Sequence, residues 1–212
     1  MRNIVPKKPP LFVAITGGTS SGKTTLAKAL QRKLGDTNAQ IISQDNYYQC
    51  CGYLPPNERS KLNYDHPSAI DFVLFKRHIG FLSEGQAIQC PLYDFKTHTR
   101  KNSCLWIKPS TIIIVEGTLI LWDEGLRKNF NYSTFLDIPD DIRLLRRLDR
   151  DIEERGRSFK EVRNQYLNTV RPMHIKFIKP CKIHANLIIK HENICSQVNK
   201  MSKEIKQILY GR

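Results

Sequence analysis

The glycine-rich segment 17–24 constrains the fold of this chain more than any other feature. It reads Gly17-Gly18-Thr19-Ser20-Ser21-Gly22-Lys23-Thr24, fits the pattern G-x-x-x-x-G-K-[ST], and directly follows the apolar run Leu11–Thr16. Glycines let successive backbone N–H groups turn inward around phosphate oxygens, and the next helix adds its positive N-terminus. Lys23 then reaches the β- and γ-phosphates, and the Thr24 hydroxyl binds Mg²⁺. With Thr25, the segment predicts a nucleoside triphosphate site between a strand and a helix.

Short apolar runs alternate along the chain with segments of helical spacing. The runs are Leu11–Thr16, Gln40–Ser43, Thr111–Val115, Thr134–Asp137 and Asn186–Ile189, and the helical segments are Thr24–Leu34, Ile70–Leu82, Ile142–Arg155 and Phe159–Val170. Such alternation is typical of an α/β fold, with a central parallel sheet covered by helices on both faces. The sequence Asp65-His66-Pro67-Ser68 is a turn and cap signal expected to start the second helix. We expect a basic tail over residues 1–10 and one domain over residues 11–212.

The segment 87–107 interrupts this alternation. It has two β-prone pieces, Ile88–Tyr93 and Ser103–Ile107, which flank a polar stretch. This arrangement predicts a small β-hairpin inserted into the α/β domain.

Composition and cysteine spacing indicate the kind of ligand and the cellular compartment of the protein. The chain has 212 residues and a formal net charge of +14, which suits an anionic ligand. Its longest strongly apolar run, Ile112–Val115, ends at Glu116 and is far too short to span a membrane. The six cysteines show no CxxC or Cys/His metal spacing, and Cys50 and Cys51 are neighbours. We therefore expect free thiols in a cytoplasmic protein, without a membrane partner.

Two acidic residues follow predicted strands. Asp45 comes just after Gln40–Ser43, and Glu116 ends Thr111–Val115. Parallel strands end at one edge of a sheet, so both residues should lie near the glycine-rich segment. Asp45 is then placed to take a proton from an attacking hydroxyl, with a simple capping role as the alternative. Glu116 is expected at Mg²⁺ with Thr24.

Arginines crowd the stretch from 143 to 157. They are Arg143, Arg146, Arg147, Arg150, Arg155 and Arg157. One interpretation is a solvated helix with i,i+4 ion pairs such as Arg147–Asp151, Arg150–Glu154 and Asp151–Arg155. The other is a lid over about 151–160, hinged where Gly156 breaks the helix, that closes on a transferring phosphoryl group.

These segments together resemble the uridine kinase (uridine–cytidine kinase) family of the P-loop kinase superfamily. The resemblance covers residues 12–189 and rests on the blocks GGTSSGKTT (17–25), SQDNYY (43–48), NYDHPSAID (63–71), PLYDFKTHTR (91–100), EG (116–117), RRLDRDIEERGRS (146–158), NQY (164–166) and VRP (170–172). It implies transfer of a phosphoryl group from ATP or GTP, with Mg²⁺, to the 5′-hydroxyl of uridine or cytidine in pyrimidine salvage. It also implies a homo-oligomer, commonly a tetramer.

The resemblance assigns roles to particular residues. Asp45 resembles the general base, Lys23 the phosphate lysine, and Arg150, Arg155 and Arg157 the lid and phosphate contacts. Asp65 resembles the residue that binds the ribose hydroxyls, with Arg147 and Gln165. Tyr93 and His98 resemble readers of the pyrimidine edge, although a histidine in a polar hairpin is ordinarily solvated. The aromatic walls around the nucleoside would be Tyr48, Tyr64 and Phe95.

The chain departs from the family at two places. Lys190-His191-Glu192-Asn193 follows the last predicted strand, where many members have a Pro-Arg-Gly-like turn near the base of the donor, and Cys50–Pro56 is also unlike the family. Other interpretations are a kinase for another small hydroxyl substrate, an RNA-binding protein that uses the P-loop as a switch, and an inactive regulator. The basic region Arg143–Lys182 lacks a named RNA-binding module, so we expect no nucleic-acid partner. Intact Lys23, Thr24, Asp45 and Glu116 argue against an inactive protein.

Overall fold

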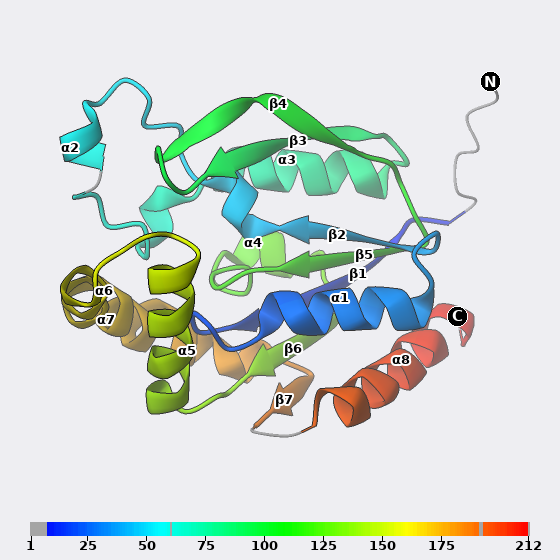
Figure 1. Ribbon diagram of the computed structural model, residues 1–212. Helices are drawn as coiled ribbons and strands as arrows, with labels where there is room; N and C mark the ends of the chain where they lie inside the picture. Colours follow the sequence, from blue (N-terminus) through cyan, green and yellow to red (C-terminus); the bar gives the residue numbers. More distant parts are fainter. Residues whose placement is uncertain (1–7, 60, 191–192, 212) are drawn as a thin grey trace.

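A sheet of five short strands forms the centre of the protein (Figure 1). The computed structural model describes residues 8–59, 61–190 and 193–211. The strands are β1 (Leu11–Gly17), β2 (Ala39–Ser43), β5 (Ile112–Glu116), β6 (Tyr132–Leu136) and β7 (Leu187–Ile189). All neighbours pair in parallel, in the order β2-β5-β1-β6-β7. The predicted parallel sheet is confirmed, and β1 with its glycine-rich continuation lies at its centre.

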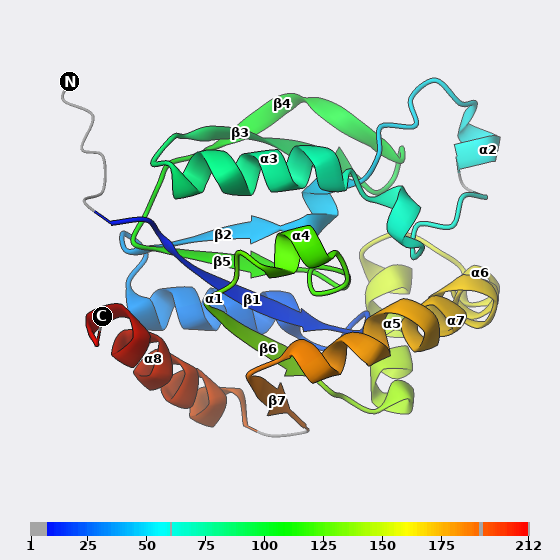
Figure 2. The ribbon, with the colours of Figure 1, turned by 180° about the vertical axis from the view of Figure 1, so that it is seen from behind.

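Helices cover both faces of the sheet, as predicted (Figures 1 and 2). They are α1 (Lys23–Leu34), α2 (Pro56–Arg59), α3 (Phe72–Ser83), α4 (Glu124–Arg127), α5 (Asp140–Glu153), α6 (Phe159–Gln165), α7 (Arg171–Met173) and α8 (Ile194–Tyr210). Short 3-10 turns occupy Gln44–Tyr47, Pro67–Ala69 and Lys179–His184, and π-helical turns occupy Tyr166–Val170 and His174–Ile178.

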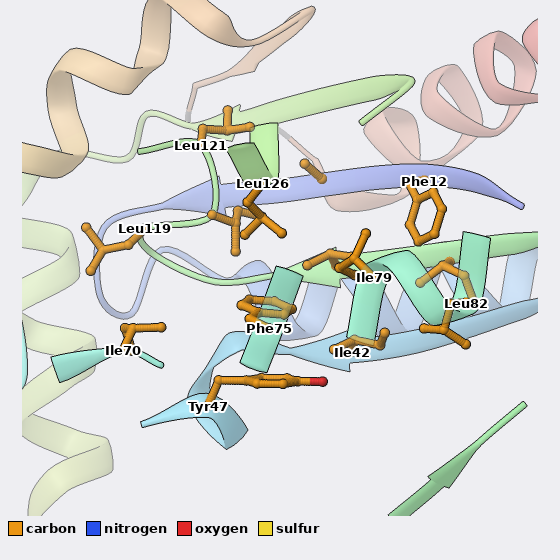
Figure 3. Packing of buried hydrophobic residues seen from close by; sticks show 14 of the residues in the cluster. Phe12, Ile42, Tyr47, Ile70, Phe75, Ile79, Leu82, Leu119, Leu121 and Leu126 are labelled. Atoms are coloured by element: carbon orange, nitrogen blue, oxygen red, sulfur yellow. The ribbon is translucent and has the colours of Figure 1, made fainter. Parts of the chain in front are cut away.

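Alternate residues of β1 face two separate hydrophobic cores, because successive side chains of a strand point to opposite faces. Val13 packs with α1 and α8, whereas Phe12 packs with α3, α4 and the hairpin. Figure 3 shows the second core, in which Phe75 and Ile79 of α3 lie over Ile42 of β2. Every residue of β1 is buried, which explains its nearly continuous apolar sequence.

The second core also supports the turn that carries Asp45. Tyr47 is fully buried in it and stacks on Phe75 with a centroid separation of 4.1 Å (Figure 3). The Tyr47 hydroxyl lies 3.0 Å from His78 Nδ1. These contacts fix the turn Gln44–Tyr47 directly after β2.

The predicted hairpin is confirmed as β3 (Ile88–Asp94) and β4 (Thr99–Ile107), an antiparallel pair separate from the main sheet. A bulge lies between Pro91 and Tyr93, since proline cannot donate to the ladder. The second strand begins at Thr99 rather than at Ser103, so polar residues that face solvent extend it. Ile88, Cys90 and Ile107 attach the hairpin to the core.

The predicted start of the second helix was wrong. The side chain of Asp71 caps α3 by accepting a hydrogen bond from Leu74 N at 2.9 Å, so the helix begins at Phe72. His66 caps only the short turn Pro67–Ala69. Asp65 is therefore not a helix cap, because the proline after His66 starts a turn that ends before the helix.

Other parts of the chain bear on the remaining expectations. All six cysteines, each within the described ranges, are free thiols, as expected. Among the described residues, no helix is long and apolar enough to cross a membrane. Residues 1–7 of the expected tail, and 191–192 of the divergent turn, lie outside the described residues.

Candidate active site

A cavity of about 520 Å³ opens at the carboxyl ends of the central strands. In parallel α/β sheets this edge is where ligands bind. The predicted site residues that line it are Thr19, Ser20, Ser21, Gly22, Lys23, Thr24, Thr25, Asp45, Tyr48, Tyr64, Asp65, Tyr93, Phe95, His98, Glu116, Arg147, Arg150, Arg155, Arg157 and Gln165. Of the predicted site residues, only Gly17 and Gly18 are absent from the lining. The fold thus brings together residues from blocks that are far apart in the sequence.

The glycine-rich loop has the backbone of an anion site. Ser20 and Gly22 adopt positive φ angles of 55° and 96°, and α1 begins at the next residue, Lys23. The Lys23 ammonium donates to Gly18 O at 2.8 Å across the loop. Burial lowers the pKa of Lys23, although Glu116 and Asp45 oppose this effect. The hydroxyls of Ser20 and Ser21 are buried without a hydrogen-bond partner among the described residues, as expected of groups that await a ligand.

Arg143 supports this loop from behind, a role that the sequence analysis did not assign. Its side chain is 1% exposed and reaches Thr19 O at 3.5 Å and Ile138 O at 3.1 Å. It also pairs with Asp140. The density of arginines in α5 concealed that Arg143 and Arg147 are buried, since only the packing of α5 against the loop distinguishes them from their neighbours.

The acidic residues lie at the adjacent strand ends. Glu116 is 4% exposed and accepts a hydrogen bond from Ser43 Oγ at 2.6 Å. Burial and the nearby Asp45 carboxylate raise the pKa of Glu116, while Lys23 acts in the opposite direction. A buried carboxylate of this kind is stabilised by a cation, because its charged form is poorly solvated.

Gln44 fixes the two acidic loops relative to each other. Its Oε1 accepts a hydrogen bond from Leu119 N at 2.7 Å, and Gly117 packs against its side chain. A Cβ at Gly117 would come within 2.3 Å of Gln44 Cβ, so the EG pair at 116–117 requires glycine at its second position. The spacing between Asp45 and Glu116 is therefore set by packing.

The donors present suit Mg²⁺ only together with a phosphate. No group of three or more His, Cys, Asp or Glu side chains in the described ranges could hold a metal by itself. Thr24 and Glu116 offer one hydroxyl and one carboxylate, both on the cavity wall. Mg²⁺ usually takes one or two protein oxygens, with phosphate oxygens and water completing its shell. The residues present fit that arrangement.

Aromatic side chains form one end of the cavity. Tyr48 contacts Tyr64, Tyr93 and Phe95, with ring centroids 5.0–6.3 Å apart. His98, at the hairpin tip with a φ of 55°, stacks on Tyr64 at 4.5 Å and 13°. Burial, and then Arg157 and Arg155, lower the pKa of His98, so its ring is neutral at pH 7. His98 is therefore part of the wall and not a solvated surface residue.

Asp65 lies beside this aromatic wall. Burial raises its pKa, and the Arg147 guanidinium opposes that effect. The Thr169 hydroxyl lies 3.2 Å from Asp65 Oδ2, a contact that the sequence analysis missed. Thr169 belongs to the π-helical turn Tyr166–Val170, and such turns often occur at functional sites.

Arg147, Arg155 and Arg157 gather where the glycine-rich loop meets the aromatic wall. Arg147 donates to Thr19 Oγ1 and to Gln165 Oε1, each at 2.9 Å, and Arg157 donates to the same Gln165 oxygen at 2.7 Å. Arg155 lies over the Phe95 ring at 4.6 Å.

The two interpretations of this segment both describe part of it. Arg147 and Arg155 pair with Asp151 as the helical spacing predicts. Helix α5 ends at Glu153, and Gly156 has a φ of 66°, so the expected break is present. The solvated-helix interpretation was wrong for Arg147, which is 5% exposed. Movement of the segment as a lid stays a prediction.

The other end of the cavity is apolar and was not predicted. Leu136, Ile138, Ile189 and Ile194 line it, with Lys190 and Gln197. These residues follow β6 and β7 or begin α8. Helix α8 was missed altogether, although Val198, Met201 and Ile205 have the spacing of an amphipathic helix and pack on α1.

Comparison with known proteins agrees with this geometry. The family model described as Phosphoribulokinase / Uridine kinase family matches residues 12–196. A uridine kinase from Brevibacillus brevis is 47% identical over 180 residues, covering 85% of this chain and 84% of the relative. A uridine kinase from Clostridium novyi is 45% identical over 202 residues, covering 94% of this chain and 97% of the relative.

Solved structures share the fold at low sequence identity. A putative fructose transport system kinase from Silicibacter superposes with a TM-score of 0.72 at 21% identity, covering 88% of this chain and 93% of that one. Phosphoribulokinase from Rhodobacter spheroides gives a TM-score of 0.62 at 13% identity, covering 87% of this chain and 70% of that one. From the match over residues 12–196 and the close relatives along nearly the whole chain, this protein belongs to the phosphoribulokinase/uridine kinase family.

Proposed function

We propose that the protein transfers the γ-phosphoryl group of ATP or GTP to the 5′-hydroxyl of uridine or cytidine, with Mg²⁺, to give UMP or CMP in pyrimidine salvage. The observation that carries the proposal is that one cavity is lined by the glycine-rich loop, by Asp45 and by the aromatic wall. Relatives called uridine kinase, 42–47% identical, support the choice of acceptor.

In this proposal the chain positions two substrates end to end. The loop residues 17–25 bind the triphosphate through backbone N–H groups and Lys23. Tyr48, Tyr64 and Phe95 enclose the nucleoside, and Tyr93 and His98 meet the polar edge of the pyrimidine. Asp65 accepts both hydroxyl hydrogens of the ribose, supported by Arg147 and Gln165. The 5′-hydroxyl then points toward the γ-phosphate.

Asp45 acts as the base in this arrangement. Its carboxylate orients the attacking hydroxyl and removes its proton as the new O–P bond forms. Lys23, Arg150, Arg155 and Arg157 stabilise the negative charge on the transferring group. Mg²⁺, bound by Thr24 and near Glu116, supplies further neutralisation of the phosphate charge when it is present.

A panel of acceptors tests the proposal. Purified protein with Mg-ATP should phosphorylate uridine and cytidine and turn over adenosine and thymidine far more slowly, because a mismatched base edge leaves buried polar groups unpaired. Equal turnover of ribulose 5-phosphate or pantothenate would refute the acceptor. Replacing ATP by GTP in the same assay measures the donor preference.

Two further expectations concern assembly, which rests on the resemblance alone, and location, which rests on the cysteines. We propose a homo-oligomer, a tetramer by analogy, and a cytoplasmic location consistent with the free thiols. Sedimentation at several concentrations tests the first, and fractionation of cells the second.

A further inference from the structure

Asp151 is the common partner of four of the arginines that line the cavity. Its side chain is fully buried. Oδ1 lies 2.7 Å from Arg150 and 3.4 Å from Arg155, and Oδ2 lies 3.4 Å from both Arg147 and Arg157. We refer to Arg147, Arg150, Arg155 and Arg157 as the guanidinium cluster. Asp151 itself is not part of the cavity wall.

Three members of the guanidinium cluster extend from Asp151 to other parts of the site. Arg147 reaches Thr19 of the glycine-rich loop, and Arg155 lies over Phe95 of the hairpin. Arg157 and Arg147 share Gln165 of α6. One carboxylate thus connects the parts of the chain that hold the phosphates, the nucleoside and the segment between α5 and α6.

The local sequence explains how one residue reaches four arginines. Arg147 and Arg155 are one helical turn before and after Asp151, where side chains lie on the same face. Gly156 then turns the chain back, and Arg157 N donates to the backbone oxygen of Asp151 at 3.0 Å. Ser158 begins α6 with a capping box. The turn therefore returns the Arg157 side chain to the same carboxylate.

The charge balance shows why the carboxylate matters. Burial alone would raise the pKa of Asp151, but the surrounding guanidinium groups outweigh this effect and lower it. The carboxylate is therefore ionised, and without it four positive groups would repel one another at close range. With it, the guanidinium cluster keeps a surplus of positive charge that faces the cavity.

We propose that Asp151 is a positioning residue for phosphoryl transfer, which holds the guanidinium cluster converged on the transferring group. This inference rests on the proposed function. Asp151 does not line the cavity, so its effect passes through the arginines. A displacement of about 1 Å in such groups can lower a rate by about 100-fold.

The test compares Asp151→Asn, Asp151→Glu and Asp149→Asn. Asn removes the charge and turns an amide N–H₂ toward guanidinium donors, whereas Glu keeps the charge but moves it by one methylene. Asp149→Asn removes the same charge from an exposed position of the same helix. We expect kcat to fall by about 100-fold for Asn and about tenfold for Glu, with Asp149→Asn equal to the parent. Binding of ATP, measured by calorimetry without acceptor, should change much less than kcat.

Limited trypsin digestion provides a readout that needs no substrate. In Asp151→Asn, cleavage after Arg155 and Arg157 should be faster than in the parent and in Asp149→Asn, because the arginines are released. The digestion experiment remains valid if the acceptor is an alcohol other than uridine or cytidine. The kcat measurements are then made with that acceptor. Failure of the proposed acceptor is therefore separable from failure of this inference.

Two results would overturn the inference. One is an Asp151→Asn protein whose kcat and trypsin cleavage match the parent. The other is an equal loss of kcat in Asn and Glu variants that both melt far below the parent, which would indicate a structural role alone. If the Asp151→Asn protein does not fold, the Asp151→Glu protein provides the test. A kcat about tenfold below the parent at an unchanged melting temperature supports the positioning role, and a kcat equal to the parent rejects it.

Discussion

Gly18 and Arg143 are in direct contact behind the glycine-rich loop. A Cβ on Gly18 would come within 2.3 Å of Arg143 Nη1 and 2.6 Å of Cζ. The buried guanidinium occupies the space that a side chain would need, and it is fixed there by Ile138 O and Asp140. Gly18, at a position where the motif accepts any residue, is therefore required to be glycine by an arginine 125 positions later.

This contact predicts the effect of Gly18→Ala. The methyl group would displace Arg143 from its buried position, and we expect a loss of about 1–3 kcal/mol in the free energy of unfolding, measured by urea denaturation. Gly80→Ala is the matched control, because Gly80 lies within α3 and a Cβ there has nothing within 4 Å. The free energy of unfolding of the Gly80→Ala protein should rise by about 0.5–1 kcal/mol. A stability equal to the parent in Gly18→Ala would contradict the contact.

Removal of the proposed base should affect chemistry and not donor binding. Asp45→Asn keeps the shape of the side chain but cannot accept the proton, so kcat should fall by about 10²–10⁴-fold. The dissociation constant for ATP, measured by calorimetry, should stay close to that of the parent. Asp36→Asn, an exposed change in the turn after α1, controls for the lost charge. A near-normal kcat in Asp45→Asn would exclude Asp45 as the base.

The raised pKa of Asp65 predicts how nucleoside binding depends on pH. In the proposed function, Asp65 accepts both ribose hydroxyls through its ionised carboxylate, and burial raises its pKa above that of an exposed aspartate. Binding is therefore complete above this raised pKa and weakens as the pH falls through it. The KM for uridine should rise toward low pH, beginning at a higher pH than an exposed carboxylate would give.

Asp65→Asn provides the control for that profile. The KM of this variant for uridine should be high at every pH. Its pH profile should lack the rise at low pH that protonation of Asp65 causes in the parent. The preference for uridine over 2′-deoxyuridine should also shrink, because the group that accepts from both hydroxyls is gone. An unchanged pH profile would show that another residue binds the ribose.

The environment of Glu116 predicts a change in the magnesium requirement. Glu116→Gln removes a buried charge near Thr24, so the Mg²⁺ concentration for half-maximal rate should rise by about 10–100-fold. Glu124→Gln, at an exposed residue that pairs with Lys128, should leave this concentration unchanged. Titration of the rate with Mg²⁺ at fixed ATP measures both. An unchanged requirement in Glu116→Gln would mean that Glu116 does not serve the metal.

Local sequence was sufficient for the sheet and for the residue types of the site. The strands β1 and β5 are apolar on both faces and therefore stand out as continuous runs. The glycine-rich motif fixes a strand, a loop and a helix in one stretch of chain. Because parallel strands end at one edge, Asp45 and Glu116 could also be expected beside it.

The start of α3 shows where local signals fail. Two acidic residues, Asp65 and Asp71, precede it, and either could cap a helix by its sequence context. The structure uses Asp71 for the cap and leaves Asp65 on the cavity wall beside Arg147. The turn Pro67–Ala69 separates Asp65 from the helix, and the sequence around Asp65 did not reveal that this turn ends before the helix begins.

The sequence by itself determined which chemical groups this protein brings to its site, because the motif and the strand pattern are written in neighbouring residues. Tertiary structure alone decided that Arg143 is buried behind the loop and that Thr169 lies beside Asp65. Both outcomes depend on burial and on distant partners: Arg143 contacts Thr19, 124 positions away, and Thr169 contacts Asp65, 104 positions away. An arginine in a helix has the same local propensity whether it faces solvent or a phosphate, so only packing separates the two.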